Sequence, residues 1–528
     1  MSQSLAETRP TGTMGGLFRS PGAIVLLLGI GCALLLALPG VTVTTRSIDE
    51  LFLLFDGIHR VLEGQIPNRD FTTSLGPLAF YLPAMIAGIT GNYGAALPTA
   101  MALVLCLMAV AARHVLLTRL HPYLALPFAA FLFLILAAPM NLGEPIAALS
   151  FAMFYNRIGW AAIALLLVLY LKPRSGDPVI RSDAAVAAAL TLILLYLRAT
   201  YGFAALVFLL FMLTDARQWR WAGTALVVVL GTVVFLALLW PGSSSYWTQA
   251  WDGVNVAGAS LFGIDRFTQP ALGHLADLLL LGLLVSFCLW RNWSWRDAAF
   301  FLLCVLGGLW LLSYNVQRWG VISIHAAAVV AAELLFRRME PDKEDGATLV
   351  NRYGVALYSL AFVLPTIVHC GMALSLHVGA AVLRAGEPVD LGRVNGIYVA
   401  DLWPGGDQRG SLNYLDAARD GLSMLRKADT SSGGLAVLGS VDVFSPALGL
   451  EPAVAVPLDM RWPSLISSGA TSPGGILGRI DTVVVRRSGE LSSGLPAAYM
   501  RYIDKNFSQI AQTDLWSLHR RASVGPAM

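Results

Sequence analysis

The chain has 528 residues, of which 56% are hydrophobic and only 13% charged, and its formal net charge is +3 at pH 7. Soluble domains carry about 25% charged residues, so this composition excludes a single soluble globule and predicts a polytopic membrane protein. The small net charge gives no reason to expect a nucleic-acid partner. The five cysteines all lie in apolar segments, a placement that indicates neither a disulfide framework nor a cysteine metal site.

Apolar runs suited to transmembrane helices, which need about 20 residues each, recur along the first 380 residues. Segment 1–21 carries Arg9 and Arg19 and has no clear cleavage site, so we expect it to be cytoplasmic and to precede an uncleaved anchor. We expect about eleven crossings, at 22–43, 97–117, 123–140, 154–171, 184–198, 200–214, 221–240, 272–290, 298–313, 320–336 and 353–378.

The loops on the side of the N-terminus hold about twice as many Arg and Lys residues as the short loops opposite, in the direction of the positive-inside rule. This division requires that 77–89, a short segment with two prolines, does not cross, and we expect it to be interfacial or re-entrant. The first loop, 44–96, and the tail, 380–528, are then on the outer face of a bacterial inner membrane.

The tail is rich in Gly, Pro, Ser and charge and has no spanning run. Its patterns predict an amphipathic helix at 411–428, buried strands at 433–442 and 480–488, a second helix near 495–507 and a last strand around 515–521. We therefore expect three parts: the cytoplasmic segment 1–21, a transmembrane domain over 22–379, and a small extracytoplasmic α/β domain over 380–528. The isolated Asp442, Asp459 and His519 of the tail are best interpreted as turn and surface residues.

The first loop concentrates charge at the membrane surface, in a chain that is otherwise poor in charge. Residues 44–83 hold five carboxylates, among them Asp49, Glu50 and Asp70, together with Arg69 and other basic groups. Ionisable groups at a bilayer predict a functional site. An alternative interpretation makes Asp49 and Glu50 only the start of the amphipathic helix that follows, and Asp70 only the cap of a turn.

Three further outer loops, 141–157, 241–271 and 314–319, and the helix end at 198–201 bring more polar groups to the same face. Their arginines are suited to a phosphate at a bilayer surface, because the guanidinium fork matches phosphate oxygens. Snorkelling arginines and a belt of interfacial aromatic residues are the alternative interpretation. The candidates from these loops are Glu144, Tyr155, Asn156, Arg157, Arg198 and Arg318.

The first loop resembles the GT-C superfamily of membrane glycosyltransferases, in particular the aminoarabinose and protein mannosyl transferases, which take sugars from polyprenyl-phosphate carriers. The matching residues are Asp49-Glu50, Gly64, Pro67, Asp70-Phe71, Gly76-Pro77-Leu78 and Tyr81. The resemblance covers about the first 160 residues, with SFAMFYNR at 150–157 as a second and weaker match. Many relatives have a Lys in an Asp-Lys-Pro-Pro-Leu run that meets the carrier phosphate, whereas this chain has no Lys between Asp70 and Leu78.

The resemblance implies sugar transfer with inversion, in which Asp49 is the general base and Glu50 or Asp70 assists. It implies that arginines replace the missing Lys, in the order Arg157, Arg69, Arg318, Arg198, and that Tyr155, Asn156 and Tyr81 contact substrate. Asp49 and Glu144 form a weak candidate site for a divalent cation. The expected partners are a polyprenyl-phosphate-linked sugar donor, a glycan, lipid or protein acceptor, and membrane lipid.

Other classes of protein compete with this interpretation. An envelope polysaccharide polymerase or ligase shares the lipid-linked substrate and is the nearer alternative. A lipid-linked glycan transporter should carry charge within its helices or show inverted repeats, and we find neither clearly in the sequence. A non-catalytic assembly protein is the third alternative.

Overall fold

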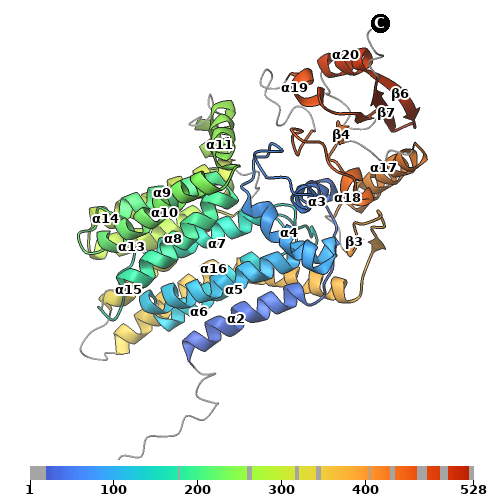
Figure 1. Ribbon diagram of the computed structural model, residues 1–528. Helices are drawn as coiled ribbons and strands as arrows, with labels where there is room; N and C mark the ends of the chain where they lie inside the picture. The colour runs from blue at the N-terminus through green and yellow to red at the C-terminus, as the bar shows by residue number, and fades with distance from the viewer. Residues whose placement is uncertain are drawn as a thin grey trace, which may run out of the picture.

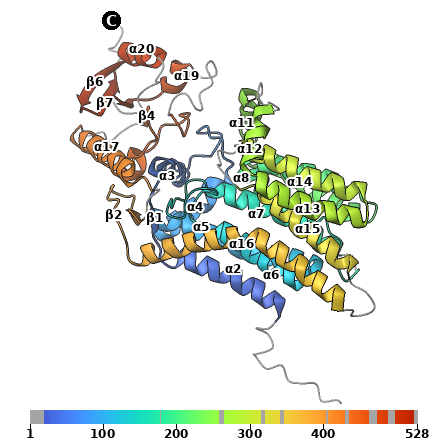
Figure 2. The same cartoon turned by 180° about the vertical axis from the view of Figure 1, so that it is seen from behind.

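The computed structural model describes residues 20–176, 179–257, 264–314, 320–339, 346–402, 406–428, 434–460, 472–487 and 497–522. A bundle of long helices forms one part, and the tail lies at one end of it (Figures 1 and 2). An apolar helix coincides with each of the eleven expected runs: α2 (Pro21–Ala37), α5 (Tyr93–Arg119), α6 (Pro122–Ala137), α7 (Phe154–Val168), α8 (Ile180–Leu197), α9 (Ala199–Met212), α10 (Trp219–Leu239), α13 (Leu275–Arg291), α14 (Trp295–Tyr314), α15 (Ile322–Arg338) and α16 (Gly346–Val382).

Five helices are long and apolar enough to cross a membrane by themselves, and the pair Phe267–Gly273 and Leu275–Arg291, bent by 80°, would make six. Several others, such as α2, α6 and α7, are apolar but have only 15 to 17 residues. The chain is therefore a polytopic helical membrane protein. The number of crossings, which we expect to be eleven, stays a prediction.

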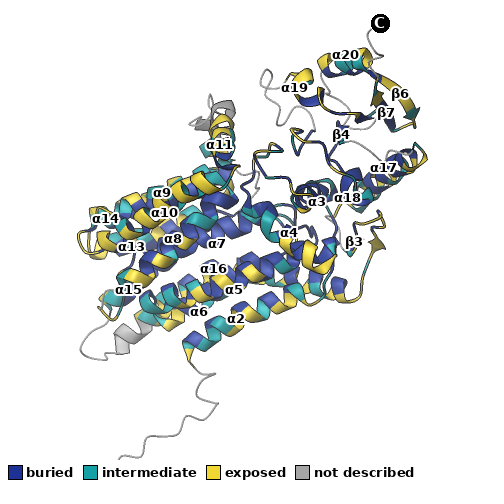
Figure 3. Ribbon diagram, in the orientation of Figure 1, coloured by how far each residue is buried: buried dark blue, intermediate teal, exposed yellow. Residues whose placement is uncertain are grey.

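The helices differ in how much of their surface is buried. In α7, fourteen of fifteen residues are buried and only Tyr155 is partly exposed. On α10, by contrast, large apolar side chains such as Val227, Phe235 and Leu238 are exposed (Figure 3). An apolar face left exposed on a long helix is typical of contact with lipid. The first turn of α7 therefore projects from the centre of the bundle and not from its rim.

The first loop contains the predicted amphipathic helix, α3 (Ile48–Leu62), and a second helix, α4 (Leu78–Thr90). The two pack closely, because a Cβ atom on Gly57 of α3 would lie 2.4 Å from the ring of Phe80 of α4. At 1.5 Å per residue, the 13 residues of α4 reach about 20 Å, less than the roughly 30 Å of a hydrocarbon core. This length supports the expectation that 77–89 does not cross, which stays a prediction.

The tail contains every element that its sequence predicts and several more. Strands β4 (Leu435–Leu438), β5 (Thr482–Arg486), β7 (Trp516–Arg521) and β6 (Phe507–Gln512) form a sheet in that order. Strands β4 and β5 are parallel and the other pairs are antiparallel. The sequence analysis missed β6, whose alternate residues are too polar to predict a buried strand. The helices of the tail are α17 (Gln408–Lys427), α18 (Phe444–Leu448), α19 (Pro473–Leu477) and α20 (Ala497–Asn506).

Both faces of this sheet are buried. On β5, Val484 packs on the side of α17 and α18, whereas Val483 and Val485 pack on the side of α19 and α20. A strand buried on both faces needs a continuous apolar run, which explains the TVVV sequence of β5. The core on the α17 side is continuous with that of the helix bundle, since Phe52 of α3 lies 5.9 Å from Tyr414 of α17, ring centroid to ring centroid.

A second, small sheet joins the tail to the first loop. Strand β1 (Thr42–Thr44), between α2 and α3, pairs in parallel with β3 (Ile397–Val399), which pairs with β2 (Glu387–Pro388). Further along the loop, Ala455 N–H donates to Asp70 O and Leu458 N–H to Thr72 O. The first loop and the tail are thus bonded through their backbones, so they lie on the same side of any membrane that the bundle spans. We call this end of the bundle the tail-side end.

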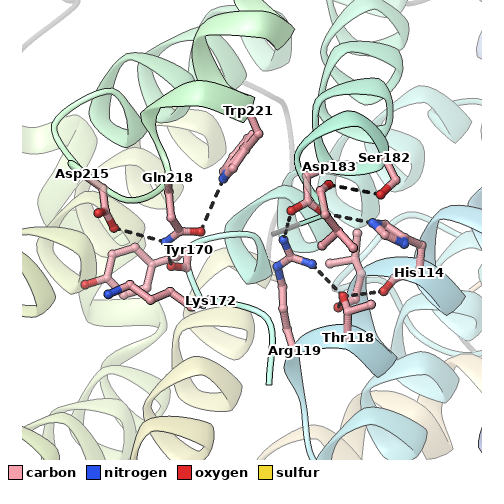
Figure 4. A network of polar contacts seen from close by, with 12 residues as sticks. His114, Thr118, Arg119, Tyr170, Lys172, Ser182, Asp183, Asp215, Gln218 and Trp221 are labelled. Carbon is pink, nitrogen blue, oxygen red and sulfur yellow. Dashed lines mark hydrogen bonds and ion pairs between the residues drawn. The ribbon is translucent and has the colours of Figure 1, made fainter. Parts of the chain in front are cut away.

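The opposite end of the bundle is held by buried ion pairs (Figure 4). The Asp183 carboxylate, at the start of α8, meets Arg119 of α5 and lies 2.9 Å from His114 Nε2. Glu333 of α15 meets Arg174, accepts from Arg337 Nε at 2.9 Å, and accepts from a backbone N–H of residue 121. Each of these two buried carboxylates therefore contacts at least two cationic or polar donors.

Candidate active site

Residues from three loops far apart in the sequence meet at the tail-side end. Glu50 lies in the first turn of α3, Tyr155 in the first turn of α7, and Arg198 at the junction of α8 and α9. The guanidinium carbon of Arg198 lies 5.0 Å from the centroid of the Tyr155 ring, a distance typical of a cation–π contact. Glu50 and Arg198 both act electrostatically on the Tyr155 hydroxyl. All three residues are partly exposed.

The break between α8 and α9 places Arg198 in this cluster. Arg198 ends α8 and precedes α9 in an extended conformation, and its Nη2 approaches Tyr314 O at 3.5 Å. Gly76, of the Gly-Pro pair in the first loop, packs directly against this break. Its N–H donates to Leu197 O at 2.9 Å, and a Cβ atom there would lie 2.1 Å from Tyr196 O. The glycine is therefore required for the first loop to approach the residue before Arg198.

Asp49 lies beside Glu50 in the first turn of α3 and is also partly exposed. The residue before the helix, Ser47, has φ 54° and makes no side-chain cap, so these carboxylates are the polar groups at the helix start. Acidic side chains are favourable in a first turn because of the helix dipole. Asp49 and Glu50 are therefore expected at these positions both if they act in catalysis and if they only start the helix.

Glu144, the other carboxylate of the suggested metal site, pairs with a cation. Its Oε2 lies 2.6 Å from Arg46 Nη1, and this pair joins the second outer loop to the first. Among the residues that the structure describes, no group of three or more His, Cys, Asp or Glu side chains could hold a metal ion. The side chains around Asp49 and Glu144 thus do not fit a metal site built by the protein, and we derive no step through a metal.

Arg69, Asp70 and Tyr81 belong to a second group. Arg69 donates to both Asp70 oxygens at 2.8 Å, and Asp70 Oδ2 also accepts from Ile66 N–H at 2.8 Å. The hydrogen bond from Arg69 lowers the pKa of the Asp70 carboxyl. Tyr81 accepts from Trp240 Nε1 at 3.3 Å. Asp70 therefore caps the turn at 66–70, as its alternative interpretation holds, and any role of this group in catalysis stays a prediction.

Arg157 and Asn156 follow Tyr155 on α7 but are buried. Asn156 Oδ1 accepts from Tyr201 O–H at 3.4 Å. The Arg157 side chain is 1% exposed, and none of its three guanidinium nitrogens has a hydrogen-bond partner in the part of the chain that the structure describes. Its guanidinium carbon lies 5.5 Å from the centroid of the Phe151 ring. Arg318 lies outside the described residues.

Two residues near this site were missed in the sequence. Arg46 stands in the charged stretch, but nothing in its neighbourhood distinguishes it from a solvated loop cation. His377 is buried near the end of α16, where its ring centroid lies 5.3 Å from that of Phe151. The available signal for this residue was a histidine within an apolar helix, which also carries His369.

Two cavities border the tail, and they do not coincide with this site. One of about 520 Å³ is lined by Asp390, Arg419 and Arg426 among others, and one of about 260 Å³ lies between α17 and the β6–β7 hairpin. None of the predicted site residues lines either cavity. The cluster around Tyr155 is thus an arrangement of partly exposed side chains, distinct from both cavities.

The solved structures that are similar to this chain include the following two. The apo crystal structure of ArnT from Cupriavidus metallidurans aligns over 95% of this chain and 99% of its own, with 14% identity and a TM-score of 0.46. The oligosaccharyltransferase of Archaeoglobus fulgidus, crystallised with Zn and sulfate, aligns over 88% of this chain and 68% of its own, with 11% identity and a TM-score of 0.36. No family model and no curated protein matches the sequence. Similarity at this level identifies neither the substrate nor the catalytic residues.

Proposed function

We propose that this protein is a GT-C membrane glycosyltransferase that moves a sugar from a polyprenyl-phosphate carrier to an acceptor, at the outer face of a bacterial inner membrane. The observation that carries the proposal is the cluster of Glu50, Tyr155 and Arg198, which brings a carboxylate, an aromatic hydroxyl and a guanidinium together from three separate loops. These groups can take up a proton, contact a sugar and stabilise a phosphate.

The reaction is a single displacement. The acceptor oxygen attacks the anomeric carbon of the sugar as the bond from that carbon to the phosphate oxygen breaks. Asp49 takes the acceptor's hydroxyl proton, and Glu50 orients the acceptor. An arginine stabilises the negative charge that develops on the departing carrier phosphate. One displacement inverts the configuration at the anomeric carbon.

The geometry changes our ranking of the arginines that could bind the carrier phosphate. Arg198 moves up, because it lies in the same cluster as Glu50. Arg69 moves down, because both of its contacts with Asp70 are already made. Arg157 remains first, because it is a buried cation whose nitrogens have no hydrogen-bond partner among the described residues. Arginine at any of these positions can offer two parallel donors to a phosphate.

The test is the pair of variants Asp49→Asn and Glu50→Gln, with Glu63→Gln as the matched control. Glu63 follows the last turn of the same helix and is exposed, so its loss alters charge without touching the cluster. We expect Asp49→Asn to abolish transfer of sugar from a labelled polyprenyl-phosphate donor, Glu50→Gln to reduce it, and Glu63→Gln to leave it unchanged. Normal glycan product with Asp49→Asn at a normal protein level would refute the proposal and favour a transporter or an assembly protein.

A further inference from the structure

The buried guanidinium of Arg157 is the least compensated charge at the tail-side end. Its Nε, Nη1 and Nη2 atoms lack hydrogen-bond partners among the described residues, and its guanidinium lies over the ring of Phe151, in the segment that precedes α7. A buried cation without a hydrogen-bonded counterion is strongly destabilising, and proteins normally keep such a group for binding or catalysis. A ligand with negative charge is therefore the missing partner.

A second unsatisfied donor lies beside the same ring. His377 of α16 contacts Phe151 edge to face, with the ring planes at 76°, and Arg157 acts on it electrostatically. Cys370 lies seven residues before His377, on the same face of α16, and Arg157 acts electrostatically on it as well.

The hydrogen bonds of His377 determine what its second nitrogen can do. Its Nε2 accepts from the backbone N–H of Val43 at 3.4 Å, so in the neutral ring the proton is on Nδ1. Nδ1 is buried and has no partner in the described part of the chain. An N–H donor is thus available beside a guanidinium that also lacks partners, and both groups suit an anion.

The bond to Val43 connects this pair to the candidate active site. Val43 is the middle residue of β1, the strand that leads into α3 and pairs with β3 of the tail. The carboxylates of Asp49 and Glu50 follow within a few residues. A shift of the His377 ring therefore moves strand β1 and, through β1, the first turn of α3.

We propose that Arg157 and His377 together form a buried phosphate-binding site for the lipid carrier, and that His377 is also a positioning residue that links occupation of this site to strand β1. This inference rests on the proposed function and deepens it. It assigns the contact with the carrier phosphate, which a Lys makes in many relatives, to Arg157 and His377 on two different helices. His377 lies outside every loop in which the sequence analysis sought site residues.

The test uses the purified full-length protein and farnesyl phosphate as the probe, with farnesol and inorganic phosphate as parallel arms. Binding is measured by the shift in thermal midpoint and by titration of intrinsic fluorescence. We expect farnesyl phosphate to bind and raise the midpoint, farnesol to have little effect, and Arg157→Met to weaken binding at least tenfold. A response to inorganic phosphate equal to that of farnesyl phosphate would identify a free-phosphate site and refute the carrier assignment.

Two substitutions of His377 separate its two roles. In His377→Gln the amide oxygen can replace Nε2 as acceptor for Val43, but the donor at Nδ1 is lost, so we expect binding to weaken about tenfold with kcat little changed. In His377→Asn the amide nitrogen can replace Nδ1 but cannot reach Val43, so we expect binding to persist and kcat to fall. A merely structural His would show the same losses in both variants.

His325→Gln is the matched control, because His325 is a buried His of the neighbouring helix α15 that stacks on Phe131. We expect it to leave binding of farnesyl phosphate unchanged. Unaltered binding in Arg157→Met and in both His377 variants would overturn this inference. The proposed function would survive that result if Asp49→Asn still abolished transfer, so the two failures are distinguishable.

Discussion

The two ends of the helix bundle differ in one buried cation. At the opposite end, the buried carboxylates of Asp183 and Glu333 meet Arg119 and Arg174, each from another element, and the first of these pairs is drawn in Figure 4. At the tail-side end, Arg157 is equally buried, but its nitrogens have no hydrogen-bond partner among the described residues. Both ends draw their charged residues from the termini of apolar helices, so position in the sequence does not separate them.

The difference indicates separate roles. Paired charges at helix ends fix how the helices pack, because each ion in a buried pair depends on the other. An unpaired buried cation stabilises nothing in the absence of a ligand. We therefore call the opposite end the structural end of the bundle, and we propose that the tail-side end, which holds Arg157, is the functional end.

The largest effect should come from breaking a pair at the structural end. Arg119→Met takes the arginine from the buried carboxylate of Asp183 and leaves its contact with His114, and we expect a loss of about 3 to 5 kcal/mol in the free energy of unfolding. Thermal or denaturant unfolding in detergent measures it. The control is Arg113→Met on the same helix, where the side chain is exposed and a change of no more than about 0.5 kcal/mol is expected.

The same substitution at the functional end should have the opposite sign. Arg157→Met removes a buried charge that has no hydrogen-bond partner and replaces it with an apolar side chain of similar length. We expect the ligand-free protein to become more stable by about 1 to 3 kcal/mol, while binding of farnesyl phosphate is lost. A loss of stability comparable to that of Arg119→Met would show that the two ends do not differ.

The sequence predicts well those features that depend on neighbours in the chain. Apolar runs of helix length locate α2 and α5 through α10, and the period of 411–428 predicts α17, because a helix or a buried strand is encoded within its own residues. The cluster of Glu50 with Tyr155 and Arg198 follows in part, since each was expected at the same end of the bundle.

Features that depend on partners far along the chain could not be predicted. The three residues of β1 form a strand only because β3 of the tail lies beside them, and Glu144 was a candidate metal ligand until its pairing with Arg46 was visible. The isolation of Arg157 is the clearest case. Whether an arginine is paired depends on the side chains of every adjacent helix. The sequence of α7 does not show which residues of α16 lie beside it.

A buried ion pair at the tail-side end itself gives a test by pH. Asp56 and Arg60 of α3 are both buried under the tail, and Arg60 Nε donates to Asp56 at 3.0 Å. Arg60 also donates to Ala453 O of the tail at 2.9 Å. Burial raises the pKa of Asp56 to about 7; the charge of Arg60 opposes this shift, and that of Asp442 adds to it.

A raised carboxyl pKa means that the folded protein holds the proton more tightly than the unfolded chain. The stabilisation from this proton is complete below about pH 4 and is lost as the pH rises toward 7. We expect the difference in unfolding free energy between wild type and Asp56→Asn to fall by up to about 1.4 kcal/mol per pH unit between pH 5 and 7, then to level off. A difference independent of pH from 5 to 8 would mean that Arg60 keeps Asp56 ionised throughout.

The smallest effect should come from the exposed pair in the first loop. The Arg69 side chain is 45% exposed, and its contact with Asp70 faces solvent, where salt screens it. We expect Arg69→Gln to change the free energy of unfolding by no more than about 1 kcal/mol, and by less in high salt. Its binding of farnesyl phosphate should stay within about twofold of wild type. If Arg69→Gln instead weakened binding as much as Arg157→Met, an exposed arginine would share the carrier phosphate, and burial without a partner would no longer distinguish the functional cation.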